Sequence, residues 1–255
     1  MLHTYINETR VALRLIEGTL EKDKQALEVG AGLCLFSLFL KQQGYQITAL
    51  EPGAGGFDAF TIAKRVILDL YHSIPLPIIE RPAQALNPAK DGQFDLIFSN
   101  NVVEHIPGFE QALAALNRCL VEDGIMIHGC PNYFVPYEPH LQIPVIKNWP
   151  TLSERVFRHQ VEAKRAIWES LNFISYFDVK RFAEMGGLQI SFRQGLLYQA
   201  FKRLDEDEAF RRRQAGSAIA SIYRLLKITG LIYLIKRLPA ALATPMVFEL
   251  RKNGR

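Results

Sequence analysis

The alternation of short apolar segments with amphipathic segments between residues 25 and 130 constrains the fold of this chain more than any other feature. Strands are expected at residues 25–30, 46–51, 77–80, 94–100 and 124–130, and helices at 33–43, 57–72 and 109–120. Strands separated by helices of this size form right-handed βαβ units with parallel pairing. Because these strands are apolar at nearly every position, we expect helices to cover both faces of the sheet.

The segments that flank this region carry further elements. A helix is expected at 5–22, and a loop rich in proline and aromatic residues begins at residue 131. Beyond the loop, the pattern predicts helices at 153–171 and 177–185, strands at 188–192 and 246–250, and a mostly helical insertion at 205–238. The whole pattern predicts an α/β protein with helical insertions after its fifth and sixth strands.

The composition of the 255 residues, 49% hydrophobic and 22% charged, is that of a globular protein and excludes a disordered or fibrous chain. Cys34, Cys119 and Cys130 are too scattered for a disulfide framework or a paired zinc motif, which favours a reducing compartment. The N-terminal residues are too charged for a secretory signal, and no run of about 18 apolar residues predicts a membrane span. We therefore expect a cytoplasmic protein.

A turn that contains two glycines follows the first predicted strand and opens the next helix. Gly30 and Gly32 allow a tight backbone turn and leave room for a ligand against the main chain. Glu51, 21 residues after Gly30, ends the next strand, where its carboxylate can accept hydrogen bonds from both hydroxyls of a ribose. This order of elements predicts a nucleoside-binding site: a strand, a glycine turn, a helix and a second strand that ends in an acidic residue.

Two residues discriminate between the nucleosides that such a turn can bind. Leu35 occupies the position of the third glycine in a dinucleotide-binding turn, which counts against NAD. Glu28 lies two residues before the first glycine, and a carboxylate there opposes a pyrophosphate but suits an amino group or a sulfonium. Both residues favour S-adenosylmethionine over a dinucleotide.

Over residues 24–135 the chain resembles the class I S-adenosylmethionine-dependent methyltransferases. The segments that carry the resemblance are LEVGAG, ALEP with Glu51, FDLIFSNNVVEHIP and LNRCLVEDGIMIHGCPN. The resemblance implies an α/β, Rossmann-like fold whose seven-stranded sheet is mainly parallel with an antiparallel last strand, plus helical cap insertions. It also implies S-adenosylmethionine as cofactor and S-adenosylhomocysteine as product.

The resemblance also implies an organisation of the chain and a set of cofactor-binding residues. We expect a single methyltransferase domain of residues 1–255, with a cofactor-binding core at 24–135, a loop and helix cap insertion at 136–175, a basic helical insertion at 200–242 and a last strand at 245–252. Relatives often bind the adenine amino group through an acidic residue after the third strand, where this chain offers the amide of Gln84. The expected cofactor-binding residues are Glu28, Gly30, Gly32, Glu51, Gln84 and Asn100.

The segment after the fourth predicted strand lies where an open sheet places reacting groups. It lacks the Asn/Asp-Pro-Pro-Tyr/Phe pattern of enzymes that methylate base amines, so no nucleic-acid substrate is expected. Glu104 and His105 are similar to the Glu-His element of many small-molecule methyltransferases. Asn101 stands where metal-dependent relatives have a glutamate, and an amide is a poorer ligand for a hard cation, so no metal is expected.

Two histidines compete for the role of proton acceptor. His105 lies at the end of a central strand, whereas His140 lies on the proline-rich loop that is expected to cover the acceptor. Tyr133, Tyr137 and Glu138 of that loop are expected to form the substrate pocket, and the last two can orient an imidazole. The alternative is that the loop only crosses the surface and its aromatic side chains cover the core. We slightly favour His140, and the alternatives are that His105 is the base or that it only supports its loop.

The C-terminal fifth of the chain is basic. Residues 202–255 hold 12 Lys and Arg against 5 Asp and Glu, whereas residues 1–201 hold 18 against 21. The helices at 205–238 are expected to contact either an anionic membrane surface, or the domain itself, or a second subunit of a homodimer. A nucleic-acid interface is not expected there, because no aromatic residues are interleaved with the arginine cluster.

These features predict an enzyme, an S-adenosylmethionine-dependent methyltransferase that O-methylates a small or glycan- or lipid-linked acceptor by in-line displacement. The alternatives are a quinone or other lipid O-methyltransferase, a nucleoside-binding protein without turnover, and an NAD-type oxidoreductase. The expected location is the cytoplasm, either free or peripherally attached to a membrane.

Overall fold

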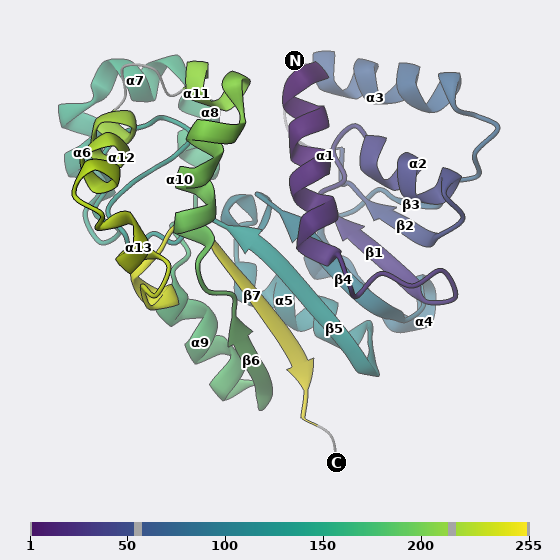
Figure 1. The fold of residues 1–255 in the computed structure, drawn as a ribbon. Coiled ribbons are helices and arrows are strands. Elements are labelled where there is room, and N and C mark those ends of the chain that lie inside the picture. Colours follow the sequence, from purple (N-terminus) through teal and green to yellow (C-terminus); the bar gives the residue numbers. More distant parts are fainter. Residues whose placement is uncertain (1, 54–57, 214–217, 254–255) are drawn as a thin grey trace.

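The computed structural model describes residues 2–53, 58–213 and 218–253, and within them a single sheet has the order β3-β2-β1-β4-β5-β7-β6 (Figure 1). Its first five strands pair in parallel, and β7 pairs antiparallel with both β5 and β6. The strands are β1 (Gln25–Val29), β2 (Gln46–Leu50), β3 (Ile78–Ile79), β4 (Phe94–Asn100), β5 (Leu120–Cys130), β6 (Leu188–Phe192) and β7 (Met246–Lys252). The predicted Rossmann-like sheet is confirmed.

Helices cover both faces of the sheet, as the apolar strands require. The helices α1 (Leu2–Ile16) and α2 (Leu35–Gln42) pack on one face, and α5 (Phe109–Arg118) and α9 (Tyr176–Met185) pack on the other. The helix α3 (Asp58–Leu70) lies near the β3 edge, and α4 (Pro88–Asp91) and the 3-10 turn Ala83–Ala85 follow β3 (Figure 1). Alternate residues of β1 supply the two cores, since Ala26 faces α1 and α2 and Leu27 faces α5.

The segment between β5 and α9 folds over the top of the sheet and has a small core of its own. Tyr133, Leu141, Val161 and Trp168 are buried together there. The predicted helix at 153–171 is wrong as one element, because the chain forms α6 (Pro150–Val156), α7 (Arg158–Ala163) and α8 (Arg165–Ser170).

The breaks between these three helices have a physical reason. Phe157 and Lys164 leave the helical region, with φ and ψ of −110° and 36° and of −136° and 38°. A straight helix over 153–171 would extend for about 28 Å. The two turns instead bring Val161, Trp168 and Leu171 onto one compact cluster.

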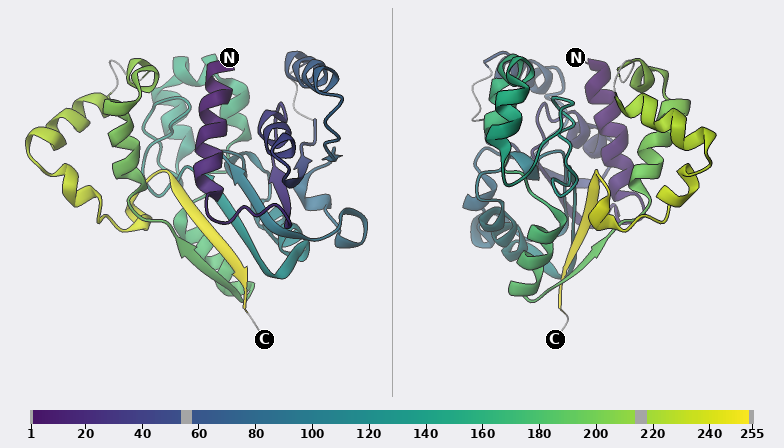
Figure 2. Two further views of the ribbon diagram at one scale, coloured as in Figure 1. Left: turned by 45° about the vertical axis from the view of Figure 1, so that its right-hand side comes forward. Right: turned by 90° about the vertical axis from the view of Figure 1, so that its left-hand side faces the viewer.

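The predicted helical insertion lies between β6 and β7 and projects from the side of the molecule away from α3 (Figures 1 and 2). It comprises α10 (Leu196–Glu206), α11 (Glu208–Arg213), α12 (Ala218–Ile228) and α13 (Ile232–Ile235), followed by a 3-10 turn at Ala240–Leu242. Residues 214–217 of the predicted insertion lie outside the described residues. None of the helices that the structure describes is long and apolar enough to span a membrane.

Candidate functional site

A cleft of about 380 Å³ opens at the carboxyl ends of β1 and β4. β1 contributes the glycine turn, β4 contributes Asn100, and α1 contributes Thr9 and Ala12 to the lining. The chain leaves β1 for α2 on one face of the sheet and leaves β4 for α5 on the other. The cleft therefore lies where the connections diverge, which is the usual ligand position in an open α/β sheet.

The glycine turn has the backbone geometry that a tight ligand approach requires. Gly30 has a φ of +71°, and a β-carbon there would lie 2.5 Å from both γ-carbons of Val102. Gly32 has a φ of +56°, and its N–H donates a hydrogen bond of 2.8 Å to Oε2 of Glu51. The positive φ values of both glycines, and the close approach of Val102 at Gly30, explain why neither position suits a larger side chain.

Glu51 lies between the glycine turn and a second hollow beside β2 and β3. Its Oε1 atom lies 3.4 Å from the N–H of Gly53, and Gly53 lines this hollow of about 530 Å³. Lys64 of α3 borders the same hollow, where its buried ammonium makes an ion pair of 3.0 Å with Glu80. The carboxylate of Glu51, at the end of β2, is thus fixed by the backbone N–H groups of Gly32 and Gly53.

Glu28 borders the cleft from β1, and only 9% of the residue is exposed. The hydroxyl of Ser37, on α2, donates a short hydrogen bond to its carboxylate. Burial raises the pKa of Glu28 to about 7; the Ser37 hydrogen bonds oppose this shift and the negative charge of Glu51 adds to it. In the free protein this carboxyl group is therefore about half protonated at neutral pH, and a cationic ligand would favour its ionised form.

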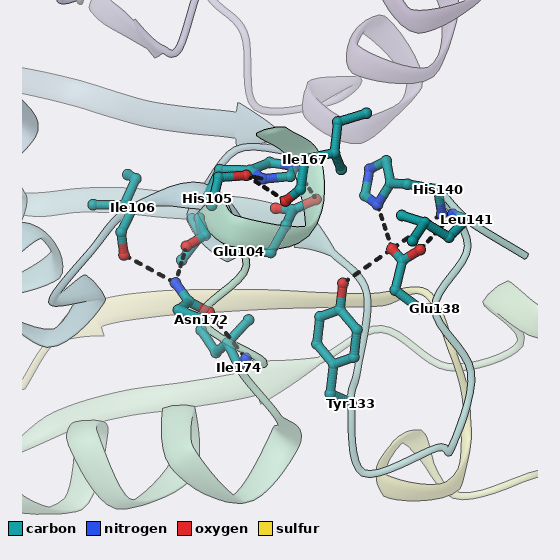
Figure 3. Close-up of polar contacts among 12 residues, drawn as sticks. Glu104, His105, Ile106, Tyr133, Glu138, His140, Leu141, Ile167, Asn172 and Ile174 are labelled. Carbon is teal, nitrogen blue, oxygen red and sulfur yellow. Dashed lines mark hydrogen bonds and ion pairs between the residues drawn. The ribbon is translucent and has the colours of Figure 1, made fainter. Parts of the chain in front are cut away.

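The segment after β4, including the 3-10 turn Val103–His105, is held by two side-chain amides. The Nδ2 atom of Asn172 donates to the carbonyl oxygens of Val103 and Ile106, at 2.7 and 2.9 Å (Figure 3). The Nε2 atom of Gln84 donates to the carbonyl oxygen of Pro107 at 2.6 Å. These bonds fix the position of the backbone that carries His105.

His140 reaches the cleft from the loop after β5 and is oriented by a buried carboxylate. The Nδ1 atom of His140 lies 2.6 Å from Oε1 of Glu138, which also accepts the His140 N–H at 3.0 Å and the Tyr133 hydroxyl at 3.3 Å (Figure 3). Burial lowers the pKa of His140, but the hydrogen bond and charge of Glu138 outweigh it and set the pKa above its ordinary value. The same contacts hold the pKa of Glu138 below its ordinary value despite burial.

His105 lies beside His140, with a ring-centroid distance of 5.2 Å. Its Nδ1 atom is 2.7 Å from the hydroxyl oxygen of Ser170, and this hydroxyl donates to the carbonyl oxygen of Ile167 (Figure 3). The hydroxyl must therefore accept from Nδ1–H, which leaves Nε2 as the unprotonated nitrogen of His105. Burial, with the charge of His140, lowers the pKa of His105 to about 4, so this imidazole is neutral at physiological pH.

Glu104, His105 and His140 offer one ligand atom each within 4.8 Å of one another. Glu138 and Ser170 occupy the two Nδ1 atoms, so both histidines can present Nε2, as metal-binding histidines commonly do. A tetrahedral zinc ion, however, holds its ligand atoms about 3.5 Å apart. The Nε2 atom of His105 lies 4.0 Å from Oε1 of Glu104, so these two groups would have to approach each other to share a zinc ion. The expectation that no metal is required stays a prediction.

The structure brings several of the predicted site residues to the cleft and places others behind it. Glu28, Gly30, Gly32, Asn100 and His140 line it. Two of the predicted pocket residues are buried instead, since Tyr133 is 1% and Glu138 0% exposed. The Tyr133 side chain packs into the small core of this segment, and its hydroxyl donates to Glu138. They support His140 rather than wall a pocket, and Tyr137, which is half-buried, does not line the cleft either.

Sequence reasoning missed Ser37 and Asn172, which position other groups of the site. Ser37 is fully buried on an otherwise apolar helix face, a signal that its hydroxyl needs a partner. Asn172 lies just after α8 with no motif around it, so only the fold reveals that it contacts the segment after β4.

Comparison of the sequence with known proteins points to one family. The profile of the family described as "Methyltransferase domain" matches residues 27–128. The chain is 34% identical over 234 residues to the uncharacterized protein Rv1509 of Mycobacterium tuberculosis, and the match covers 89% of this chain and 78% of that protein.

Solved structures share the fold at low sequence identity. Phosphoethanolamine N-methyltransferase 2 of Haemonchus contortus matches with a TM-score of 0.55 and 14% identity over 97% of this chain. This chain spans about half of that structure, at 53%. The [4+2]-cyclase SpnF matches with a TM-score of 0.56 and 16% identity, over 97% of this chain and 82% of that one.

The sheet order, the cleft at its switch point and the glycine turn with Glu51 define a nucleoside-binding protein of the Rossmann-like class. Together with the profile match, they identify the family. The chain belongs to the class I S-adenosylmethionine-dependent methyltransferases, and S-adenosylmethionine is the cofactor of that family.

Proposed function

We propose that this protein transfers a methyl group from S-adenosylmethionine to a hydroxyl group of a small or glycan- or lipid-linked acceptor. The observation that carries the proposal is the position of His140. This imidazole lines the same cleft as Glu28 and the two glycines, and the buried carboxylate of Glu138 holds its Nδ1 atom. A cofactor cleft bordered by an oriented imidazole suits transfer to an oxygen whose proton must be removed.

Residues that line the cleft and residues beside it would contact different parts of the cofactor. Gly30 and Gly32 line the cleft where its amino-acid portion would lie, and the carboxylate of Glu28 complements the amino group and the sulfonium. Glu51 would accept hydrogen bonds from the ribose hydroxyls while keeping its bond from Gly32. Gln84 donates through Nε2 to Pro107, so its Oε1 atom would accept from the adenine amino group.

The transfer itself is an in-line displacement, in which the acceptor oxygen attacks the methyl carbon and the sulfonium sulfur leaves with the bonding electrons. The cleft contributes alignment and proximity. His140 would take the hydroxyl proton on Nε2, because Glu138 holds Nδ1 and stabilises the imidazolium that forms. His105 stays neutral beside it.

Two measurements test this proposal. Calorimetry with S-adenosylmethionine, S-adenosylhomocysteine and NAD should show binding of the first two and none of the third. Transfer of labelled methyl groups should then be compared for the wild type, His140→Ala and His105→Ala with sugar, glycolipid and quinone acceptors. His140→Ala should lower the rate about 10²–10⁴-fold without weakening cofactor binding. Binding of NAD, or full activity in His140→Ala, would contradict the proposal.

A further inference from the structure

The outer surface of α12 and α13 exposes large apolar side chains. Those more than 45% exposed are Ile222, Leu225, Ile228, Leu231, Tyr233 and Leu234, and we call this set the α12–α13 face. It lies on a projecting part of the molecule, on the side away from α3 (Figures 1 and 2). Scattered apolar residues are common on protein surfaces, but six large ones exposed on two successive helices favour an interaction site.

The exposed residues are additional to those that hold the insertion together. On α12, Tyr223 and Leu226 point inward and pack with Phe201 of α10, and Ile232 of α13 joins this cluster. The residues on the outward side of α12 recur at steps of three, which places them along one side of the helix. α12 thus has one apolar side that stabilises the insertion and a second that faces solvent.

The chain segment that carries the α12–α13 face has charges of a single sign. Residues 209–248 contain seven arginines and lysines and no aspartate or glutamate. Arg224, Lys236 and Arg237 of this segment are exposed on or next to the two helices. Lys227 is paired with Asp205 of α10 at 2.7 Å and so also stabilises the insertion.

We propose that the α12–α13 face docks on an anionic membrane surface, with its aliphatic side chains and Tyr233 inserted at the interface and Arg224, Lys236 and Arg237 near the head groups. Aliphatic side chains, a tyrosine and flanking cations are the combination that membrane interfaces favour. A second copy of the chain fits less well, because a two-fold contact through this face would bring two surfaces of the same positive charge together. The inference is independent of the chemistry of methyl transfer.

The helix α3 provides a matched control. It also exposes three aliphatic side chains, Ile62, Val66 and Leu70, but on the opposite side of the molecule (Figure 1). Its described residues include the cations Lys64 and Arg65 and the anion Asp69, so the charges on this helix are of both signs. The comparison therefore tests whether the location of the apolar residues, and not only their exposure, determines binding.

The test is co-sedimentation of the full chain with vesicles of phosphatidylcholine alone or mixed equally with phosphatidylglycerol. We expect binding to the mixed vesicles only, and weakening by salt. Ile222→Ser/Leu225→Ser/Ile228→Ser should abolish binding. Arg224→Glu/Lys236→Glu/Arg237→Glu should weaken it at least 100-fold, since each cation contributes about fivefold. Ile62→Ser/Val66→Ser/Leu70→Ser on α3 should bind like the wild type.

Three results would overturn the proposal. These are equal binding to both vesicle types, equal loss in the α3 variant, or a dimer in analytical ultracentrifugation that only the α12 serine variant converts to a monomer. The last result would assign the face to a second copy. Circular dichroism and calorimetry with S-adenosylmethionine should be unchanged in every variant, so a failure of docking is distinguishable from a failure of folding or of cofactor binding.

Discussion

Glu28 should bind the methyl donor in its ionised form, although burial keeps about half of its carboxyl groups protonated in the free protein at pH 7. If only the ionised form binds, the apparent dissociation constant is raised about 2-fold at pH 7 and about 11-fold at pH 6 by the protonated fraction. Affinity should therefore increase about fivefold between pH 6 and pH 7. Binding at pH 7 should release about half a proton.

Glu28→Gln separates this effect from folding. The amide keeps an acceptor for the Ser37 hydroxyl but cannot ionise, so the variant should bind S-adenosylmethionine more weakly and without pH dependence in this range. Because the folded state raises the pKa of Glu28 from 4.5 to about 7, ionisation of this residue lowers folding stability as the pH rises through that window. The variant should consequently gain up to about 3 kcal/mol of free energy of unfolding at pH 8.

The assay is isothermal titration calorimetry at pH 6.0, 6.5 and 7.0 in buffers of different ionisation enthalpy, which gives both affinity and proton release. Urea unfolding at pH 8 measures the gain in stability. Glu17→Gln, at an exposed position of the chain, is the matched control and should change neither quantity. A wild-type affinity that is constant from pH 6 to pH 7, or a Glu28→Gln variant that binds as tightly as the wild type, would refute the reasoning.

Three further predictions concern the same site. Glu51→Ala should lower the affinity for S-adenosylmethionine at least tenfold in calorimetry, because charge-assisted hydrogen bonds contribute about 1.5–3 kcal/mol each. An unchanged affinity would exclude Glu51 as the acceptor of the ribose hydrogen bonds. Gly30→Val should lose binding and be destabilised, since its side chain would meet Val102 at a positive φ, and a stable variant that binds normally would make the turn merely structural. Turnover should rise with pH as His140 loses its proton. Glu138→Gln should move the rising limb of the pH–rate profile to lower pH, because it removes the negative charge that raises the pKa of His140. An unchanged profile would exclude the Glu138–His140 contact as the cause of the raised pKa.

Much of the fold could be predicted from the sequence because the relevant interactions are local. The period of apolar residues separates strands from helices, and it correctly located every strand of the sheet within a few residues. The turn at Gly30 and Gly32 could be recognised because its backbone conformation is one that other residues rarely adopt. The spacing from Gly30 to Glu51 predicted that the two residues share a site, because adjacent parallel strands such as β1 and β2 end at the same edge of a sheet.

Other features depended on contacts that no local pattern encodes. The periodicity at 153–171 predicted one helix, yet a compact cluster around Trp168 required two breaks. Tyr133 and Glu138 looked like pocket residues because polar aromatic loops often line pockets, whereas the fold buries both side chains. Likewise, the sequence of α12 does not say which of its two apolar sides is covered by α10.

The sequence by itself determined the class of fold, the nucleoside site and the positive charge of the C-terminal region. Only the tertiary structure decided that Glu28 is paired with Ser37 and shifted to a pKa of about 7, and that Glu138 holds His140 at the cleft. Backbone conformation and hydrophobic period follow from neighbours along the chain, so a sequence carries them directly. Desolvation and hydrogen-bond partners depend on every atom that surrounds a group in space, and those atoms come from distant segments that only the fold brings together.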